Sequence, residues 1–422
     1  MTVHDVVCVG AGPFNLGLAA LAEPTGLDVV VLEQRDDVGW HSGMLLPEAT
    51  LQVPFLADLV TLADPTSPYS FLAFLKETGR LYPFYVRERF YPLRVEYDRY
   101  LRWAADGLGV RTAHRVERIE RDPRTGDHVV TARTASGAPT RLRTRHVVLG
   151  VGTRPWVPEA LAGLDGPVLH SAEYLRHRAR LQESESVTVV GSGQSAAEIY
   201  RDLLEGAPDR GQRLSWVTRS PRFFPMEYTK LTLEMTSPEY TAYFRSLPEP
   251  VRDRLNREHT ALYKGISGDL VDDIHETLYR LSATGRLETD LVAGTAVRAA
   301  TWDGAGYDLE LHHAETATTY TARTGALVLA TGYRAELPAC IEPLREHVHW
   351  DARGRYAVAD DYSVDDEHRI FVQNAEEHTH GFVAPDLGMG AYRSSIVLNA
   401  LCGREVHPVE QRIAFQRFGA PT

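Results

Sequence analysis

The strongest constraint on the fold is a glycine-rich pattern that occurs twice in this chain. At residues 6–15, VVCVGAGPFN, an apolar run leads into Gly10, Gly12 and Asn15 at the spacing G-x-G-x-x-N. Such a run is typical of a buried parallel strand, and glycine at the turn lets the backbone approach a pyrophosphate closely. The residues that follow predict a helix whose first N–H groups face that phosphate. The pattern therefore indicates a dinucleotide-binding unit.

The first unit also carries an acidic residue at the position where such units bind ribose. The run Asp28–Leu32 predicts a second strand, and Glu33 follows it directly. A carboxylate there accepts hydrogen bonds from the ribose hydroxyls of an adenine dinucleotide. The fingerprint alone would also fit a tight strand–helix turn that binds no ligand. The position of Glu33 favours a nucleotide site over this alternative.

The same plan starts again further along the chain. Val187–Val190 predicts a strand, GSGQSAAE (191–198) follows it into a helix, and Leu214–Val217 predicts the next strand. This strand ends in Thr218 and Arg219, and the arginine offers a cation where a 2′-phosphate would lie. We therefore interpret the first unit as an FAD site and the second as an NADPH site. A solvated surface arginine is the alternative interpretation of Arg219.

Each unit also contains a predicted hairpin followed by a short apolar strand that ends in glycine. The hairpin strands are predicted at 128–133 with 140–145 and at 307–312 with 318–323, and the apolar strands at 147–149 and 326–330. Alternation of polar and apolar residues indicates the hairpins. Residues 94–105 have the spacing of a helix, whereas prolines break residues 51–68 into loop and short helices. Two units with the same order of elements indicate two dinucleotide-binding domains more specifically than one fingerprint does.

Composition narrows the class of protein. The 422 residues suffice for two or three domains, and 57 acidic against 45 basic residues give a net charge of −12, which disfavours nucleic acid and anionic membranes as partners. Cys8, Cys340 and Cys402 form no C-x-x-C pair and no metal-ligand spacing, so we expect no metal and no dithiol reductase. Because no signal peptide and no apolar run of roughly 18 residues are recognised, a cytoplasmic protein is predicted.

The order of the motifs resembles a known class of enzymes. Between the fingerprints, Gly166, His170 and Tyr174 are spaced G-x-x-x-H-x-x-x-Y, and ATGY (330–333) follows the second unit. This order is similar to class B flavin monooxygenases, although Leu164 stands where their linker motif commonly has phenylalanine.

More narrowly, the chain resembles the siderophore-type N-hydroxylating monooxygenases, the lysine/ornithine N-monooxygenase family. The resemblance runs from Val6 to about Leu398, and the segments that carry it are WHSGM (40–44), LQVPFLADLVTLADPTSPYSFL (51–72), GSGQSAAE, ATGY and THGF (379–382). Members of this family act on lysine, ornithine or the corresponding decarboxylated diamines.

The resemblance implies an α/β fold with two Rossmann-like dinucleotide-binding domains and a small helical substrate-binding domain. We expect an FAD domain at 1–165 and 335–422, an NADPH domain at 166–222 and 287–334, and the helical domain at 223–286. It also implies that NADPH reduces FAD and that a C4a-hydroperoxyflavin transfers oxygen from O₂ to a primary amine, so no protein residue is predicted to be catalytic. A homotetramer is expected by the same resemblance.

The residues expected to bind a cofactor follow from the fingerprints and the resemblance together. Trp40, His41 and Gln52 match positions that line the flavin, and Gln194 and Ser195 match positions near the nicotinamide. A core role for Trp40 and a capping or bridging role for His41 are the alternatives. The full predicted set is Gly10, Gly12, Pro13, Phe14, Asn15, Glu33, Gln34, Trp40, His41, Gln52, Gly191, Gly193, Gln194, Ser195, Arg219, Thr331 and Leu387.

The substrate prediction depends on cations and amides that this chain lacks. Amino-acid hydroxylases of the family commonly read F-x-K-D-L, with a lysine that pairs with the substrate carboxylate, where this chain has Ala57. Ornithine hydroxylases also place one asparagine where this chain has Leu233 and a second near Ile266. Losing a cation opposite a buried carboxylate costs about 3–5 kcal/mol, which alanine and leucine do not recover. We therefore predict a diamine, cadaverine or putrescine.

A diamine carries a second ammonium, so the pocket needs an acceptor for it. Asp386, Glu376 and Glu377 are the candidates, and a turn cap is the alternative role of Asp386.

Two other functions remain open from the sequence. An L-lysine N6-monooxygenase would hold the carboxylate elsewhere, for example with Arg94 or Lys230. An NADPH oxidase or flavin reductase would consume NADPH without forming a hydroxylamine. The helical stretch 222–286 is expected to close over the substrate, and a structural cover for the NADPH domain is the alternative.

Overall fold

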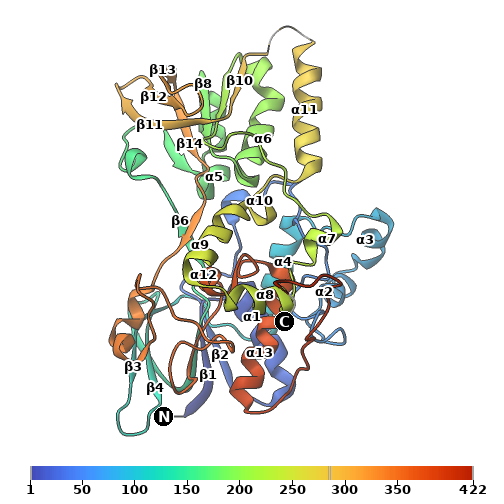
Figure 1. Ribbon diagram of the computed structural model, residues 1–422, viewed down its shortest axis with the longest axis vertical. Helices are drawn as coiled ribbons and strands as arrows, with labels where there is room; N and C mark the ends of the chain where they lie inside the picture. The colour runs from blue at the N-terminus through green and yellow to red at the C-terminus, as the bar shows by residue number, and fades with distance from the viewer. Residues whose placement is uncertain (1, 284, 286, 421–422) are drawn as a thin grey trace.

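The computed structural model describes residues 2–283, 285 and 287–420 and stacks two sheet-based units along its long axis. The first unit, at the bottom of Figure 1, carries β1–β5, and the second unit, at the top, carries β8 and β14. Helices α8, α9, α10 and α12 lie between them in this view. The two predicted dinucleotide fingerprints therefore belong to separate sheets.

The first sheet has the order β2-β1-β5-β4-β3, with β16 also paired to β5. Its strands are β1 (Val3–Val9), β2 (Val29–Leu32), β3 (His114–Arg121), β4 (His128–Thr134), β5 (Pro139–Leu149) and β16 (Ile370–Val372). Strand β1 runs parallel to β2 and β5, and its last four residues are buried. This is the buried parallel strand that the apolar run predicts.

Strand β5 corrects one expectation. The hairpin strand predicted at 140–145 and the separate strand predicted at 147–149 form one continuous strand. Its first part pairs antiparallel with β4, while residues 147–149 pair parallel with β16 on the same side. Because the partner changes along the strand, the side-chain pattern changes from alternating to continuously apolar without a break in the backbone.

Five α-helices belong to the described part of the first unit. They are α1 (Pro13–Ala22), α2 (Phe71–Glu77), α3 (Leu81–Arg87), α4 (Arg94–Gly107) and α13 (Gly390–Cys402). Helix α1 packs against both α4 and α13, which brings the last helix of the chain beside the first. The helix predicted at 94–105 is confirmed. The short helices expected within residues 51–68 are wrong, because these residues form turns and loop without a helical residue.

The second sheet is parallel throughout, in the order β10-β9-β8-β14-β7. Its strands are β7 (Val168–His170), β8 (Ser186–Val190), β9 (Arg213–Val217), β10 (Thr289–Val292) and β14 (Ala326–Leu329). Beside it lie the three antiparallel strands β11 (Thr295–Trp302), β12 (Tyr307–His313) and β13 (Thr318–Thr324) and the helices α5 (Tyr174–Glu183) and α6 (Gln194–Arg210). The hairpin predicted before β14 is confirmed.

Two short strands connect the units. Strand β6 (Thr153–Pro155) leaves the first unit, β15 (Tyr333–Ala335) returns to it, and the two pair antiparallel. The two chain segments that connect the units are therefore hydrogen-bonded to each other as a two-stranded antiparallel ribbon, the β6–β15 ribbon. Short 3₁₀ helices lie at Glu23–Thr25, Ser42–Met44, Glu159–Leu161, Ser171–Glu173, Ala339–His347 and Leu387–Met389.

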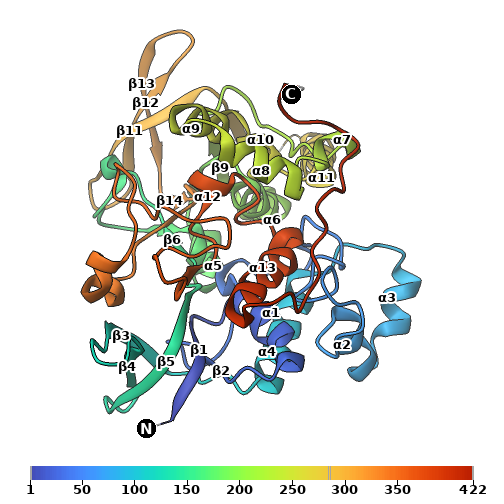
Figure 2. The same cartoon turned by 60° about the horizontal axis from the view of Figure 1, so that its bottom comes forward.

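The helical stretch divides between the two units. It contains α7 (Lys230–Leu233), α8 (Pro238–Ser246), α9 (Glu249–Glu258), α10 (Thr260–Tyr263) and α11 (Gly268–Ser282). Helices α8 and α9 pack against α12 (Glu377–His380) of the C-terminal segment, as Figure 2 also shows. Helix α11 instead packs against α6, with Ile274 and Leu281 in the core of the second unit. In the described part of the chain, none of the helices is both long enough and apolar enough to cross a membrane.

Candidate functional site

A single cavity of about 2470 Å³ joins the two fingerprints. It is lined by the carboxyl ends of β1, β2, β8 and β9, by the linker strands and by α9, α10 and the C-terminal segment. Every residue predicted above to bind a cofactor lines this cavity. Ligands of open α/β sheets bind at the carboxyl ends of the strands, so the cavity lies where two dinucleotides are expected.

The first fingerprint leaves room for a diphosphate. Gly10 has φ +93°, and a Cβ atom there would lie 2.5 Å from the Gly150 carbonyl oxygen, so only glycine fits this turn. A Cβ atom on Gly12 would meet no protein atom within 4 Å, because it would point into the cavity. Helix α1 starts after Gly12 without a side-chain cap. Its N-terminus can therefore hold a phosphate, which fits FAD.

Glu33 and Asn15 have different roles in this loop. Glu33 lines the cavity at the end of β2, and its carboxylate accepts the Ala11 N–H at 3.0 Å. Asn15 is fully buried, and its Nδ2 donates to the Gly10 carbonyl oxygen at 2.8 Å. Its Oδ1 accepts a hydrogen bond from Gln373 at 2.9 Å. The Asn15 side chain thus fixes the turn, and only its backbone N–H is available to a phosphate. The hydrogen bond between Asn15 and Gln373 joins residues far apart in the sequence, so a local sequence motif cannot predict it.

The predicted flavin-lining residues form one wall. The Trp40 ring packs edge-on against Tyr97 and His41, and its backbone N–H donates to Asp98 at 2.8 Å. His41 lines the cavity. Desolvation by the surrounding protein, together with the Arg94 and Arg35 charges, lowers the pKa of His41 to about 4. The imidazole is therefore neutral near pH 7 and can donate or accept a hydrogen bond.

The second fingerprint has the same features. Helix α6 begins after Gly193 without a side-chain cap, and Gly193 lines the cavity. Arg219 follows β9, is exposed and lines the same wall. An uncapped helix N-terminus and a nearby guanidinium suit a pyrophosphate and a 2′-phosphate, so these residues fit NADPH.

A polar network joins the two units beside the cavity. Gln52 donates to Gln194 at 3.2 Å, Gln194 donates to Glu198 at 2.8 Å, and Glu198 forms an ion pair with Arg94 at 2.8 Å. Gln194 Oε1 also accepts the Ser267 N–H at 2.8 Å. Burial raises the pKa of Glu198, and Arg94 opposes this shift. The network fixes Gln194 at the start of α6, where the nicotinamide end is expected.

The four residues predicted to bind substrate do not lie together. Leu233 and Asp386 line the cavity. Ala57 is buried behind the turn at 386–388, since a Cβ atom on Gly388 would lie 4.0 Å from the Ala57 Cβ. Ile266 is fully buried in the core of the second unit and is not among the residues that line the cavity. The preceding residues 260–265 do line the cavity.

The acidic candidates also separate. Asp386 accepts the Gly388 N–H at 2.6 Å, so it caps this turn while it faces the cavity, and burial raises its pKa. Glu376 is fully buried in an ion pair with Arg393 and does not line the cavity. Glu377 lines the cavity. Of the three, Asp386 and Glu377 are accessible to a ligand.

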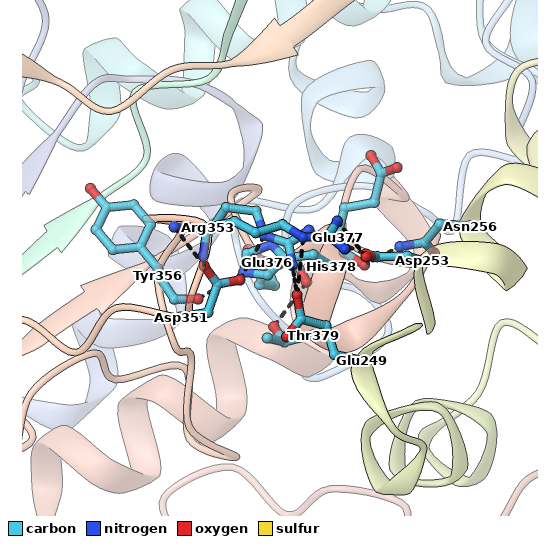
Figure 3. Close-up of polar contacts among 11 residues, drawn as sticks. Glu249, Asp253, Asn256, Asp351, Arg353, Tyr356, Glu376, Glu377, His378 and Thr379 are labelled. Carbon is cyan, nitrogen blue, oxygen red and sulfur yellow. Dashed lines mark hydrogen bonds and ion pairs between the residues drawn. The ribbon is translucent and has the colours of Figure 1, made fainter. Parts of the chain in front are cut away.

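Sequence reasoning missed a polar cluster at the end of the cavity. Figure 3 shows α9 residues Glu249, Asp253 and Asn256 facing Arg353 and α12. Both Arg353 and the neighbouring Arg355 form ion pairs with Glu249 and Asp253. No local motif marks these residues, since each becomes a neighbour of the others only through folding.

The fold and the cavity define a flavoprotein with two dinucleotide sites. The chain matches the family described as L-lysine 6-monooxygenase/L-ornithine 5-monooxygenase over residues 2–335. It therefore belongs to this family of flavin-dependent N-monooxygenases.

Individual relatives match 95–100% of this chain. A putrescine N-hydroxylase of Shewanella oneidensis is 44% identical over 420 residues, which are 99% of this chain and 84% of that protein. The FAD-bound structure of DfoA, the cadaverine monooxygenase of the desferrioxamine pathway of Erwinia amylovora, is 47% identical with a TM-score of 0.98 and full coverage of both chains. The Kutzneria ornithine N-hydroxylase structure with reduced FAD, NADP⁺ and L-ornithine is 30% identical, with a TM-score of 0.86 and coverage of 95% and 99%.

Proposed function

We propose that this enzyme N-hydroxylates one primary amine of an aliphatic diamine, cadaverine or putrescine, with FAD, NADPH and O₂, for hydroxamate siderophore biosynthesis. The observation that carries the proposal is the identity of 42–47% to relatives described as acting on putrescine or cadaverine. The ornithine N-hydroxylase is more distant, at 30% identity.

Residues in and beside the cavity support the absence of a substrate carboxylate. Ala57 replaces the cation that amino-acid hydroxylases of the family carry, and the nearby turn presents the Asp386 carboxylate instead. The two cations considered for an L-lysine substrate are not suited to this role. Arg94 is paired with Glu198, and Lys230 is exposed and does not line the cavity.

The protein has two tasks in such a reaction. The reacting amine must be neutral, although an alkylammonium has a solution pKa near 10.4, and a desolvated site favours the free base. FAD supplies the oxygen-activating chemistry when it is bound, and the protein around it must keep water from the reacting centre. Trp40, Gln52 and Leu387 would hold the flavin, and Gln194 would orient the nicotinamide.

The proposal includes the domain division and the remaining site residues given above. It also includes a cytoplasmic homo-oligomer, a tetramer by family resemblance. Exposed apolar side chains on and after α3, at Tyr82, Tyr85, Val86 and Phe90, support a subunit contact there. Light scattering of the purified protein would test the assembly, and a monomeric mass would refute it.

The first experiment measures hydroxylamine formed per NADPH consumed with cadaverine, putrescine, L-lysine and L-ornithine. We expect coupled product with the diamines alone. Product from lysine or ornithine would refute the substrate proposal, and NADPH consumption without hydroxylamine from any amine would favour the oxidase or flavin reductase.

A further inference from the structure

The cavity wall contains an ammonium group that is already held by a carboxylate and an aromatic ring. Lys264 Nζ lies 3.6 Å from Glu377 Oε1 and 4.4 Å from the centroid of the Tyr263 ring. The Tyr263 hydroxyl donates to the same carboxylate oxygen at 2.7 Å. All three residues line the cavity. A carboxylate beside an aromatic face is the arrangement that recognises an alkylammonium ion.

The Glu377 carboxylate is positioned by its neighbours. Asn256 Nδ2 donates to the Glu377 backbone carbonyl at 2.9 Å, which fixes α12 against α9 (Figure 3). Burial and the adjacent carboxylate raise the pKa of Tyr263, so its hydroxyl stays protonated and remains a donor. The Glu377 side chain is 41% exposed, so a ligand can reach it from the cavity.

The other acidic side chains of this region are more fully engaged. Asp253 forms ion pairs with Arg353 and Arg355, and Asp386 accepts a backbone N–H from its own turn. Glu377, in contrast, is hydrogen-bonded through its side chain to a neutral hydroxyl, and its cationic partner Lys264 is itself 54% exposed and lies beyond hydrogen-bond distance. A second ammonium can displace such a partner at little cost.

We propose that Glu377 and Tyr263 bind the distal ammonium of the diamine, and that the Lys264 ammonium occupies this place until the substrate displaces it. This inference rests on the proposed function. Two consequences separate it from a structural role. A monoamine of the same length has no group for this place, so Glu377 favours the diamine selectively. Removal of the Lys264 ammonium frees the place, so diamine binding improves.

The test compares cadaverine with 1-aminopentane in the FAD-loaded enzyme, by hydroxylamine formation. We expect Glu377→Gln to lower the cadaverine-to-aminopentane ratio of kcat/KM about tenfold, chiefly through KM for cadaverine. Lys264→Met raises the same ratio severalfold. Glu258→Gln is the matched control, because Glu258 on α9 loses the same charge, pairs only at 3.8 Å with Arg254 and does not line the cavity. It leaves the ratio unchanged.

The outcomes distinguish this inference from the proposed function. No hydroxylamine from either diamine with the unmodified enzyme refutes both. If that enzyme is active, the inference is overturned by an unchanged ratio in Glu377→Gln, or by a larger fall in Asp386→Asn. It is also overturned if Lys264→Met raises KM for cadaverine, since Lys264 would then assist binding. The Lys264→Met result is a gain, so a folding defect cannot imitate it.

Discussion

Removal of Arg94 should destabilise the contact between the two units. In Arg94→Met the Glu198 carboxylate, 5% exposed, loses its cation and keeps only the Gln194 amide as a partner. At 2.8 Å and an effective dielectric constant of about 20, the lost attraction is about 6 kcal/mol before desolvation is counted. Breaking one partner of a buried pair costs about 3–5 kcal/mol in measured cases, and we expect a loss in this range.

The loss should depend on pH. Burial raises the pKa of Glu198 in the folded protein, and removal of Arg94 raises it further. A carboxyl whose folded pKa exceeds its unfolded value contributes stability that is complete at low pH and is lost as pH rises through the folded pKa. The deficit of Arg94→Met relative to the unmodified protein should therefore be larger at about pH 8 than at about pH 5.

Thermal unfolding of the FAD-loaded protein, followed by flavin fluorescence and circular dichroism, measures this effect. About 3 kcal/mol corresponds to a fall in Tm of roughly 6–12 °C for a unit of this size. Arg94→Met with Glu198→Gln should recover part of the loss, because the neutral amide needs no cation. Equal Tm values for Arg94→Met and the unmodified protein, or no recovery in the double variant, would refute the reasoning.

Three further outcomes test the cofactor and substrate sites. Arg219→Ala should raise KM for NADPH at least about tenfold while KM for NADH changes little, and an equal rise for both would contradict the 2′-phosphate role. Gly12→Val places a side chain in the cavity without meeting protein atoms, so the FAD content should fall severalfold while the Tm of the FAD-free protein stays nearly constant; unchanged FAD content would argue against this site. Ala57→Lys brings an ammonium behind the turn of Asp386, and we expect a higher KM for the diamine, which steady-state kinetics would show; an unchanged KM would separate Ala57 from substrate binding.

The sequence predicted the parts of the fold that short-range patterns encode. The strands that end in Gly10 and Gly191, both hairpins and the helix from Arg94 follow from apolar runs, alternation and spacing. Strand β3 was missed because His114–Arg121 is rich in charged residues at the edge of its sheet. Two strands were predicted where β5 is a single strand, because its side-chain pattern changes from alternating to apolar where its partner changes from β4 to β16.

The cofactor site was more predictable than the substrate site, for a physical reason. Phosphate and ribose are bound by a backbone turn and by the end of a strand. These positions require glycine and glutamate at fixed spacings, which are visible in the sequence. The proposed substrate end is assembled from α9, α10 and α12, whose side chains meet only in the folded chain. Residues 260–266 illustrate this difference, because residues 260–265 line the cavity and Ile266 is buried, and no sequence pattern marks which side chains face the cavity.

The division of the helical stretch has a mechanical consequence. Helix α10, which packs on α9, ends at Tyr263. Helix α11, which packs on α6 of the second unit, begins at Gly268, so residues 264–267 form the connection between them. The Gly265 carbonyl accepts a hydrogen bond from Gln52, and Ser267 donates to Gln194, so this connection is tied to both units. A rotation of the units about the β6–β15 ribbon would pull directly on Lys264. A change in the position of the nicotinamide and a change in the binding of the amine would then be coupled through residues 264–267.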